Sequence, residues 1–170
     1  DEPTTALDVT VQAQILEVIG EQRRDRNMSV VLVTHDLGVV AGHTDQIAVM
    51  YGGKLVERAP TKTLFAEMRM PYTKSLLKSI PKLADPSHTR LATITGRPPD
   101  LVNPPKGCNF AQRCPYARPK CHVEEPALEP TADPNHVFAC WYPVGSPEFT
   151  EREAELEAAG YVPATVAGVS

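Results

Sequence analysis

Residues 45–57, with the sequence DQIAVMYGGKLVE, decide the fold class of this chain because they predict a β-hairpin. Apolar and β-branched residues lie on both sides of Gly52 and Gly53. A pair of glycines between two such stretches favours a tight two-residue turn, because both positions of that turn need a positive φ angle. The segment therefore predicts two strands joined at Gly52-Gly53.

Helix and strand patterns alternate on the N-terminal side of this hairpin. Apolar residues recur at helical spacing within residues 11–19, and Asp8 stands where a helix cap is expected. Residues 29–33 are almost continuously apolar or β-branched, which is typical of a parallel strand buried on both faces. Asp36 is placed to cap a following short helix. Because short helices also follow the hairpin, one of them over residues 72–80, the order of elements predicts an α/β fold.

The composition changes near Pro81. Most of the 17 prolines and all four cysteines lie between Pro81 and Pro147, and prolines at this density exclude long regular helices. In the Glu-rich stretch that follows, Thr150 and Glu153 resemble a capping box for a last short helix that ends at Gly160. We expect this helix to dock weakly and the acidic tail to be mobile. The predicted divisions are residues 1–80, 81–147 and 148–170.

Charge and hydropathy limit the classes of partner. The chain has 17 basic and 21 acidic residues, which gives a net charge of -4. A nucleic-acid-binding domain usually carries a basic surface, so we expect no nucleic-acid partner. No apolar run approaches the roughly 18 to 20 residues that a membrane-spanning helix requires. Any link to a membrane is therefore expected to pass through partner subunits.

Acidic residues and a histidine lie where two strands of the predicted sheet would end. Asp1 and Glu2 open the chain, and His35 follows the predicted strand over residues 29–33. Ligands of open parallel sheets bind beyond the carboxyl ends of the strands. Two carboxylates at this edge could hold Mg²⁺ and activate a water, and a histidine could donate to a phosphate oxygen. The residue pattern alone leaves an ordinary acidic pair and a structural histidine as open alternatives.

Four unevenly spaced cysteines form the second candidate site. Two disulfides, a zinc site, an iron–sulfur cluster and free thiols are all compatible with four cysteines. The C-x₂-C pairs typical of structural zinc are absent, whereas irregular spacing with a proline after Cys114 is compatible with a cluster. The spacing leaves zinc and a cluster equally open for Cys108, Cys114, Cys121 and Cys140.

The N-terminal blocks resemble a known ATPase domain. The sequence DEPTTALDVTVQAQIL, residues 1–16, is similar to the end of the Walker B strand and the D-loop of ABC-transporter ATPases. The sequence VLVTHDLGVVAGHTDQIAVMYGGKLVE, residues 31–57, is similar to their switch-histidine loop. The resemblance extends over residues 1–80 and implies the C-terminal half of a P-loop (ABC-type) nucleotide-binding domain.

The resemblance also implies a role for each matching residue. Asp1 corresponds to the Walker B aspartate that holds the Mg²⁺ of Mg-ATP through water, and Glu2 corresponds to the catalytic glutamate that polarises the attacking water. His35 corresponds to the switch histidine that contacts the γ-phosphate, and Asp8 to the D-loop aspartate at the interface of two ATPase domains. The chain departs from the family in having no G-x-x-x-x-G-K-[ST] loop and no signature motif. We therefore expect a C-terminal fragment that does not hydrolyse ATP by itself.

The cysteine-containing segment resembles the irregular C-terminal extension of oligopeptide/dipeptide-type ABC ATPases. The similarity lies in ITGRPPDLVNPPKGCNFAQRCPYARPKC, residues 94–121, and in HVFACW, residues 136–141. Some members of that family bind a [4Fe–4S] cluster through four such cysteines. The resemblance therefore implies a structural [4Fe–4S] cluster, with zinc as the alternative, because a metal centre stabilises a segment that buries little core.

The resemblance implies an ATP-binding and ATP-hydrolysing subunit that energises an ABC importer of di- or oligopeptides. Its place would be the cytoplasmic face of a prokaryotic cell membrane, as a peripheral subunit. The implied partners are a second, paralogous ATPase subunit, two transmembrane permeases and an extracytoplasmic solute-binding protein. A nickel or glutathione importer of the same family is one alternative. A non-catalytic metal- or Fe–S-binding interaction module is the other.

Overall fold

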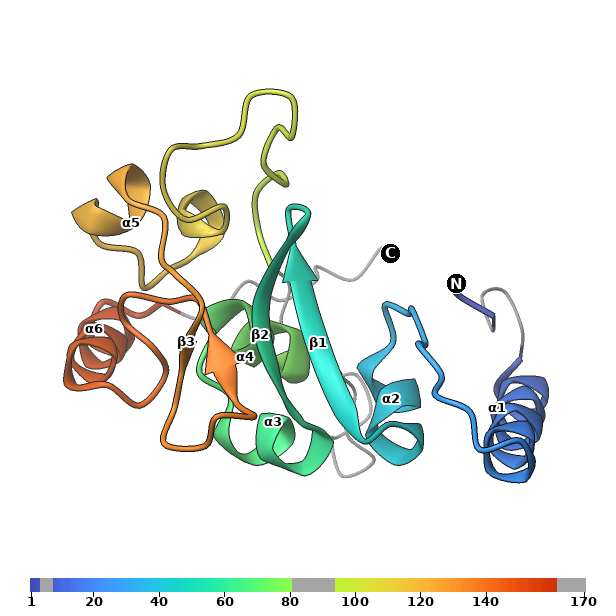
Figure 1. The fold of residues 1–170 in the computed structure, drawn as a ribbon. Coiled ribbons are helices and arrows are strands. Elements are labelled where there is room, and N and C mark those ends of the chain that lie inside the picture. Colours follow the sequence, from blue (N-terminus) through green and yellow to red (C-terminus); the bar gives the residue numbers. More distant parts are fainter. Residues whose placement is uncertain (4–7, 81–93, 162–170) are drawn as a thin grey trace, which may run out of the picture. The chain divides into compact units, whose positions relative to one another are not determined.

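The computed structural model describes residues 1–3, 8–80 and 94–161. The contacts between residues divide the chain into two compact units, Asp1–Asp45 and Gln46–Ser170. Each unit is described by itself below, and Figure 1 shows the elements of both. The predicted boundary near Pro81 falls outside the described residues, so the predicted domain divisions stay predictions.

The first unit contains two helices, α1 (Val9–Asp25) and α2 (Leu37–His43). Asp8 begins α1, because its Oδ1 accepts hydrogen bonds of 3.0 Å from the backbone N–H groups of Thr10 and Val11. Asp36 begins α2 in the same way and accepts a 2.8 Å hydrogen bond from the N–H of Gly38. Both predicted helix caps are therefore confirmed, and each satisfies N–H groups that lack a partner inside the helix.

The segment between these helices differs from the prediction. Residues 29–33 form no strand in the described part of the chain, and the side chain of Val31 is 89% exposed. The carbonyl of Val33 accepts a 2.8 Å hydrogen bond from the N–H of Glu2. The prediction of a buried parallel strand is thus wrong here, because a strand exists only where a neighbouring strand completes the ladder.

The second unit is built on the predicted hairpin. Strands β1 (Gln46–Tyr51) and β2 (Lys54–Pro60) pair antiparallel, with φ angles of +56° at Gly52 and +76° at Gly53 in the turn. Only glycine adopts such angles without steric cost, which explains the Gly-Gly pair. The hairpin is confirmed.

Two very short strands from the C-terminal part of the chain extend this hairpin. β4 (Val137–Phe138) pairs with β2, and β3 (Glu129–Pro130) pairs with β4, which gives the antiparallel order β1-β2-β4-β3 (Figure 1). The sheet of this unit is therefore antiparallel, as the predicted hairpin requires, and the mixed α/β class holds. β2 and β4 are distant in sequence, and their pairing joins the hairpin to the Cys-rich segment in one unit.

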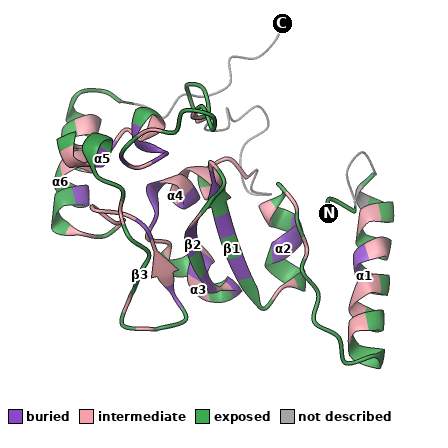
Figure 2. Ribbon diagram, turned by 45° about the horizontal axis from the view of Figure 1, so that its top comes forward, coloured by how far each residue is buried: buried purple, intermediate pink, exposed green. Residues whose placement is uncertain are grey.

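Helical elements of this unit that precede its last helix are α3 (Thr61–Glu67), α4 (Pro71–Lys78), the 3₁₀ helix η1 (Ala111–Arg113) and α5 (Pro119–Val123). Buried residues lie on β1, β2, α3 and α4 (Figure 2). Tyr51, Tyr72 and Phe110 pack their rings against one another with centroids 4.6 to 5.1 Å apart. This aromatic cluster joins the hairpin and α4 to the segment that carries the first two cysteines.

The last helix, α6 (Pro147–Ala158), forms where the Glu-rich stretch predicted a helix. Its cap is Ser146, whose Oγ accepts a 3.1 Å hydrogen bond from the N–H of Phe149, so the predicted capping box at Thr150 is wrong. Gly160 follows the helix with a φ angle of +72°, as a C-terminal glycine should. The side chain of Phe149 is only 2% exposed, which shows that the helix docks more firmly than predicted. Residues 162–170 lie outside the described part of the chain.

None of the helices in the described part of the chain is long and apolar enough to cross a lipid bilayer.

Candidate functional site

The first unit brings Glu2 and His35 together. The N–H of Glu2 donates to the Val33 carbonyl, and this bond places residue 2 beside the loop that ends at His35. His35 Nδ1 then lies 2.9 Å from Glu2 Oε1 on an exposed surface. The hydrogen bond and charge of Glu2 raise the pKa of the His35 imidazole above its ordinary value of 6.5. Two predicted catalytic side chains, 33 positions apart, therefore contact each other.

The remaining predicted acids of this unit occupy different positions. Asp1 precedes Glu2 directly and is exposed. Asp8 uses Oδ1 to cap α1, so its carboxylate has a structural role in this chain. Mg²⁺ prefers carboxylate oxygens and waters, which Asp1 and Glu2 offer at the surface. The roles assigned to Asp1, Glu2, Asp8 and His35 stay predictions.

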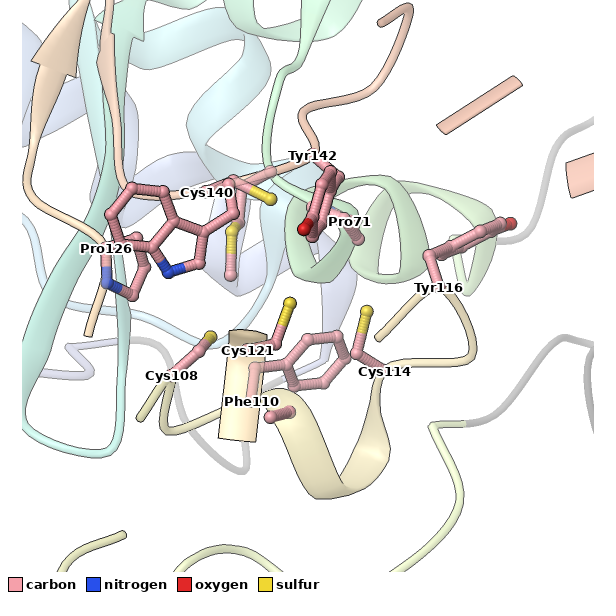
Figure 3. Close-up of a pocket in the computed structure, with 12 residues that line it drawn as sticks. Pro71, Cys108, Phe110, Cys114, Tyr116, Cys121, Pro126, Cys140 and Tyr142 are labelled. Carbon is pink, nitrogen blue, oxygen red and sulfur yellow. The ribbon is translucent and has the colours of Figure 1, made fainter. Parts of the chain in front are cut away.

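In the second unit, all four cysteines line a single cavity. Its empty volume is about 340 Å³, part of which is open solvent, and apolar and aromatic side chains form the rest of its wall. Figure 3 shows the sulfur atoms of the four cysteines directed toward this space. The structure thus places Cys140 in the same cavity as three cysteines that are closer together in sequence. All four are free thiols.

Backbone contacts determine how the first three cysteines approach. The N–H of Cys108 donates a 2.8 Å hydrogen bond to the carbonyl of Cys121, which holds the two segments side by side. Gly107 permits this approach, because a Cβ atom at residue 107 would lie 2.3 Å from the Cys121 carbonyl oxygen. The turn through η1 places Cys114, with the N–H of Ala111 donating to the carbonyl of Cys108.

The fourth cysteine arrives through the sheet. Cys140 follows β4 closely, and the N–H of Ala139 donates a 2.9 Å hydrogen bond to the carbonyl of Val56 in β2. The pairing of β4 with β2 therefore brings Cys140 to the side of the cavity that the hairpin approaches. Sequence spacing could not show this contact, because strands of two residues carry almost no pattern.

Burial changes the chemistry of these thiols. It raises the pKa of the Cys108 and Cys114 thiols and raises the pKa of Cys140 to about 12. In each case the backbone N–H group two positions later donates a hydrogen bond to the sulfur and opposes this rise. Burial thus favours the neutral form of these three thiols, and a bound cation would supply the positive charge that makes thiolates favourable.

Within residues 1–3, 8–80 and 94–161, no group of three or more His, Cys, Asp or Glu side chains is arranged to hold a metal ion. The four sulfur atoms surround the cavity without converging on one point. Sequence reasoning also missed Glu57, a fully buried carboxylate near the cavity that pairs with the buried His136. Its signal in the sequence is weak: an acidic residue that directly follows the apolar residues Leu55 and Val56.

Comparison with known proteins finds similar proteins over most of the chain. Residues 56–121 match the family described as "Oligopeptide/dipeptide transporter, C-terminal region". The chain is 50% identical over 141 residues to the dipeptide transport ATP-binding protein DppD of Bacillus subtilis (strain 168), covering 83% of the chain and 42% of that relative. Over most of its length the chain is thus similar to the ATP-binding subunits of oligopeptide/dipeptide ABC transporters.

Two other relatives of this family are similarly close. DppD of Escherichia coli (strain K12) is 46% identical over 144 residues, which cover 85% of the chain and 43% of that protein. The oligopeptide transport ATP-binding protein OppD of Bacillus subtilis (strain 168) is 44% identical over 154 residues, which cover 91% of the chain and 43% of that protein. The chain spans less than half the length of these curated relatives. The resemblance derived from the sequence motifs is confirmed.

The family match includes three of the four cysteines, whereas the cavity contains all four. The matched range of 56–121 includes most of β2 and the first three cysteines, and Cys140 lies beyond it. The structure nevertheless places Cys140 in the same cavity, because β4 pairs with a strand inside the matched range.

Proposed function

We propose that this chain is part of the ATP-binding, ATP-hydrolysing subunit of an ABC importer for di- or oligopeptides, bound peripherally to the cytoplasmic face of a prokaryotic membrane. The relatives' names support the peptide cargo and the binding of ATP. The observation that carries the proposal is the 2.9 Å contact between Glu2 and His35. It joins a carboxylate that can orient water to an imidazole that can donate to a phosphate oxygen.

In this proposal the described residues share the work at the γ-phosphate of Mg-ATP. Asp1 holds the Mg²⁺ through water, and the metal ion neutralises phosphate charge when it is bound. Glu2 orients the attacking water by accepting a hydrogen bond from it. His35 donates to the γ-phosphate, and its contact with Glu2 orients its ring and favours the protonated form. Asp8 lies at the interface with the second ATPase domain, where the start of α1 orients it.

The test requires a polypeptide that contains these residues together with a phosphate-binding loop. Glu2→Gln should retain ATP binding and reduce turnover by about 10² to 10⁴-fold, the usual contribution of a general base. His35→Ala should also reduce turnover. Glu17→Gln, an exposed carboxylate on α1, is the control and should hydrolyse ATP like the wild type. Wild-type turnover in Glu2→Gln would refute the proposed role.

We also propose that Cys108, Cys114, Cys121 and Cys140 bind a [4Fe–4S] cluster with a structural role. Supporting this, the four thiols surround one cavity with an otherwise apolar lining. A four-iron cluster takes one thiolate on each of four separate irons, whereas zinc needs its four ligands about 2.3 Å from one point. Sulfur atoms spread around a cavity fit the first requirement better. Backbone N–H donors at three of the sulfurs favour the thiolate form.

Anaerobic purification tests this second proposal directly. The complete chain should show a broad absorption band near ~400 nm and contain iron, and both signals should be lost together in Cys114→Ser and Cys140→Ser. Nucleotide binding by the complete polypeptide should change little in these variants. Zinc without iron in the wild-type protein would contradict the cluster and support the alternative metal.

The proposed partners are a second, paralogous ATPase subunit, two transmembrane permeases and an extracytoplasmic solute-binding protein. Nickel and glutathione cargoes are not favoured, because the matching relatives are named for dipeptides and oligopeptides. A purely non-catalytic module is not favoured either, since these relatives are named as ATP-binding proteins. Peptide-stimulated ATP hydrolysis in the reconstituted complex is the expected result, and stimulation by nickel alone would contradict it.

A further inference from the structure

A buried carboxylate–imidazole pair joins the hairpin to the Cys-rich segment. Glu57 in β2 is 0% exposed and His136, just before β4, is 1% exposed. His136 Nε2 lies 2.9 Å from Glu57 Oε1, across 79 positions of sequence. Buried ionisable groups are costly unless they are fully hydrogen-bonded, so a pair at this depth needs a physical reason.

Glu57 also holds the start of α4. Its Oε1 accepts a 2.6 Å hydrogen bond from the N–H of Arg69, and its Oε2 accepts a 3.1 Å hydrogen bond from the N–H of Met70. Met70 and Pro71, the next residue, both line the cysteine cavity. One carboxylate therefore fixes the backbone of this wall of the cavity while it binds His136.

His136 orients the segment that carries the fourth cysteine. Its backbone N–H donates a 3.0 Å hydrogen bond to the Asp133 carbonyl, and its own carbonyl accepts one of 2.8 Å from the N–H of Thr131. This tight turn leads directly into β4, where Phe138 pairs with Glu57 in the strand register. Cys140 follows Phe138 by two residues, and its thiol lines the cavity.

We propose that Glu57 and His136 are positioning residues for the cysteine cavity, which hold Cys140 and the Met70–Pro71 wall in place for a metal centre. Glu57 and His136 are not themselves ligands of the metal centre in this proposal. β4 has only two residues, and so short a strand cannot fix its own position by backbone pairing alone. The buried pair supplies the missing constraint. The proposal rests on the proposed cluster site for its purpose, although the positioning itself can be measured without a metal.

The test uses the complete chain, stripped of metal with a chelator and kept reduced. The alkylation rate of each cysteine by iodoacetamide is measured by mass spectrometry. Glu57→Gln keeps the shape of the side chain but replaces one carboxylate oxygen with an NH₂ group. That NH₂ group is a donor, so it cannot accept the hydrogen bond that the oxygen accepted. His136→Leu removes the imidazole that pairs with Glu57 and leaves the two backbone hydrogen bonds of Glu57 in place. Both should raise the alkylation rate of Cys140 by about tenfold or more and that of Cys121 by less than about twofold, since Cys121 is held by the Gly107 contact.

Matched controls separate positioning from general loss of stability. Glu129→Gln and His43→Leu carry the same chemical changes at exposed sites and should leave all four rates unchanged. His136→Gln keeps a hydrogen-bond donor and should restore part of the protection of Cys140. Trp141, the one tryptophan of the chain, lines the cavity, so its fluorescence should shift with the Cys140 rate.

The outcomes distinguish the alternatives. An equal rise at all four cysteines would show that the pair only stabilises the whole unit, and it would overturn the positioning role. An unchanged Cys140 rate in both variants would overturn it too. If His136→Leu does not fold, the comparison between His136→Gln and Glu57→Gln decides. A wild-type chain that binds no iron would contradict the proposed cluster while leaving a Cys140-selective effect as support for the positioning role.

Discussion

Gly107 and Cys121 approach so closely that no side chain fits between them. A Cβ atom at residue 107 would lie 2.3 Å from the carbonyl oxygen of Cys121, and the N–H of Cys108 donates to that same oxygen. Backbone atoms, which cannot rotate away, form the obstacle. The contact brings Cys108 and Cys121 to the same cavity. Residue 107 must be glycine because there is no room for a Cβ atom.

Gly107→Ala should therefore separate these two segments. We expect a loss of about 1 to 3 kcal/mol in the free energy of unfolding, as for other overpacked sites. Urea unfolding measures it, and faster alkylation of Cys108 should accompany it. Gly42→Ala is the control, because a Cβ at residue 42 meets nothing within 4 Å. Equal stability of the two variants would contradict the importance of this contact.

The hairpin turn offers a comparison between neighbouring glycines. Gly53→Ala should cost about 1 to 2 kcal/mol, because a residue with a side chain resists positive φ and the surroundings are open. Gly52→Ala should cost more, since its Cβ would also lie 2.9 Å from Asn109 Nδ2, which donates to the Gly52 carbonyl. Gly53→Asn should cost least. Chemical denaturation gives the order, and an equal loss in both alanine variants would show that Asn109 moves aside freely.

Phe149 should account for most of the docking of α6. Its ring packs against Tyr116 with centroids 4.2 Å apart, and Lys74 Nζ lies 4.6 Å from its centre. Phe149→Ala should lower the free energy of unfolding by about 3 to 5 kcal/mol and release α6, which amide hydrogen exchange would detect. Glu157→Ala, on the exposed side of the helix, should change stability by less than about 0.5 kcal/mol. Unaltered exchange of α6 in Phe149→Ala would refute this anchor.

The Glu2–His35 contact predicts a pH dependence. Because the folded pKa of His35 is raised above its ordinary value of 6.5, the folded state binds more protons than the unfolded state between these values. The contribution of the pair to stability is therefore complete below pH 6.5 and is lost as the pH rises through the folded pKa. NMR titration of the imidazole should show the raised pKa, and Glu2→Gln should abolish the rise. Glu17→Gln should leave it unchanged, and a raised pKa in Glu2→Gln would exclude Glu2 as its cause.

Local signals in the sequence predicted the local structures well. The Gly52-Gly53 turn and the caps Asp8 and Asp36 depend on interactions within a few residues, and the structure contains all three. The last helix was also predicted, but its cap was misplaced, because Ser146 and Thr150 are both good capping residues and the burial of Phe149 selects between them. Residues 29–33 show the limit of propensity, since apolar, β-branched residues form no strand without a neighbour to pair with.

By itself, the sequence determined the hairpin, the helix caps and the family resemblance, because each depends on residues that are neighbours in the chain or on whole motifs. It predicted that Glu2 and His35 lie near each other, but the strand predicted before His35 is absent and the sequence could not show their contact. Only the tertiary structure placed Cys140 beside Cys121, and only it paired Glu57 with His136. Such contacts join segments through two-residue strands and buried hydrogen bonds. Their energy exists only when the distant partner is in place, so no local pattern records them.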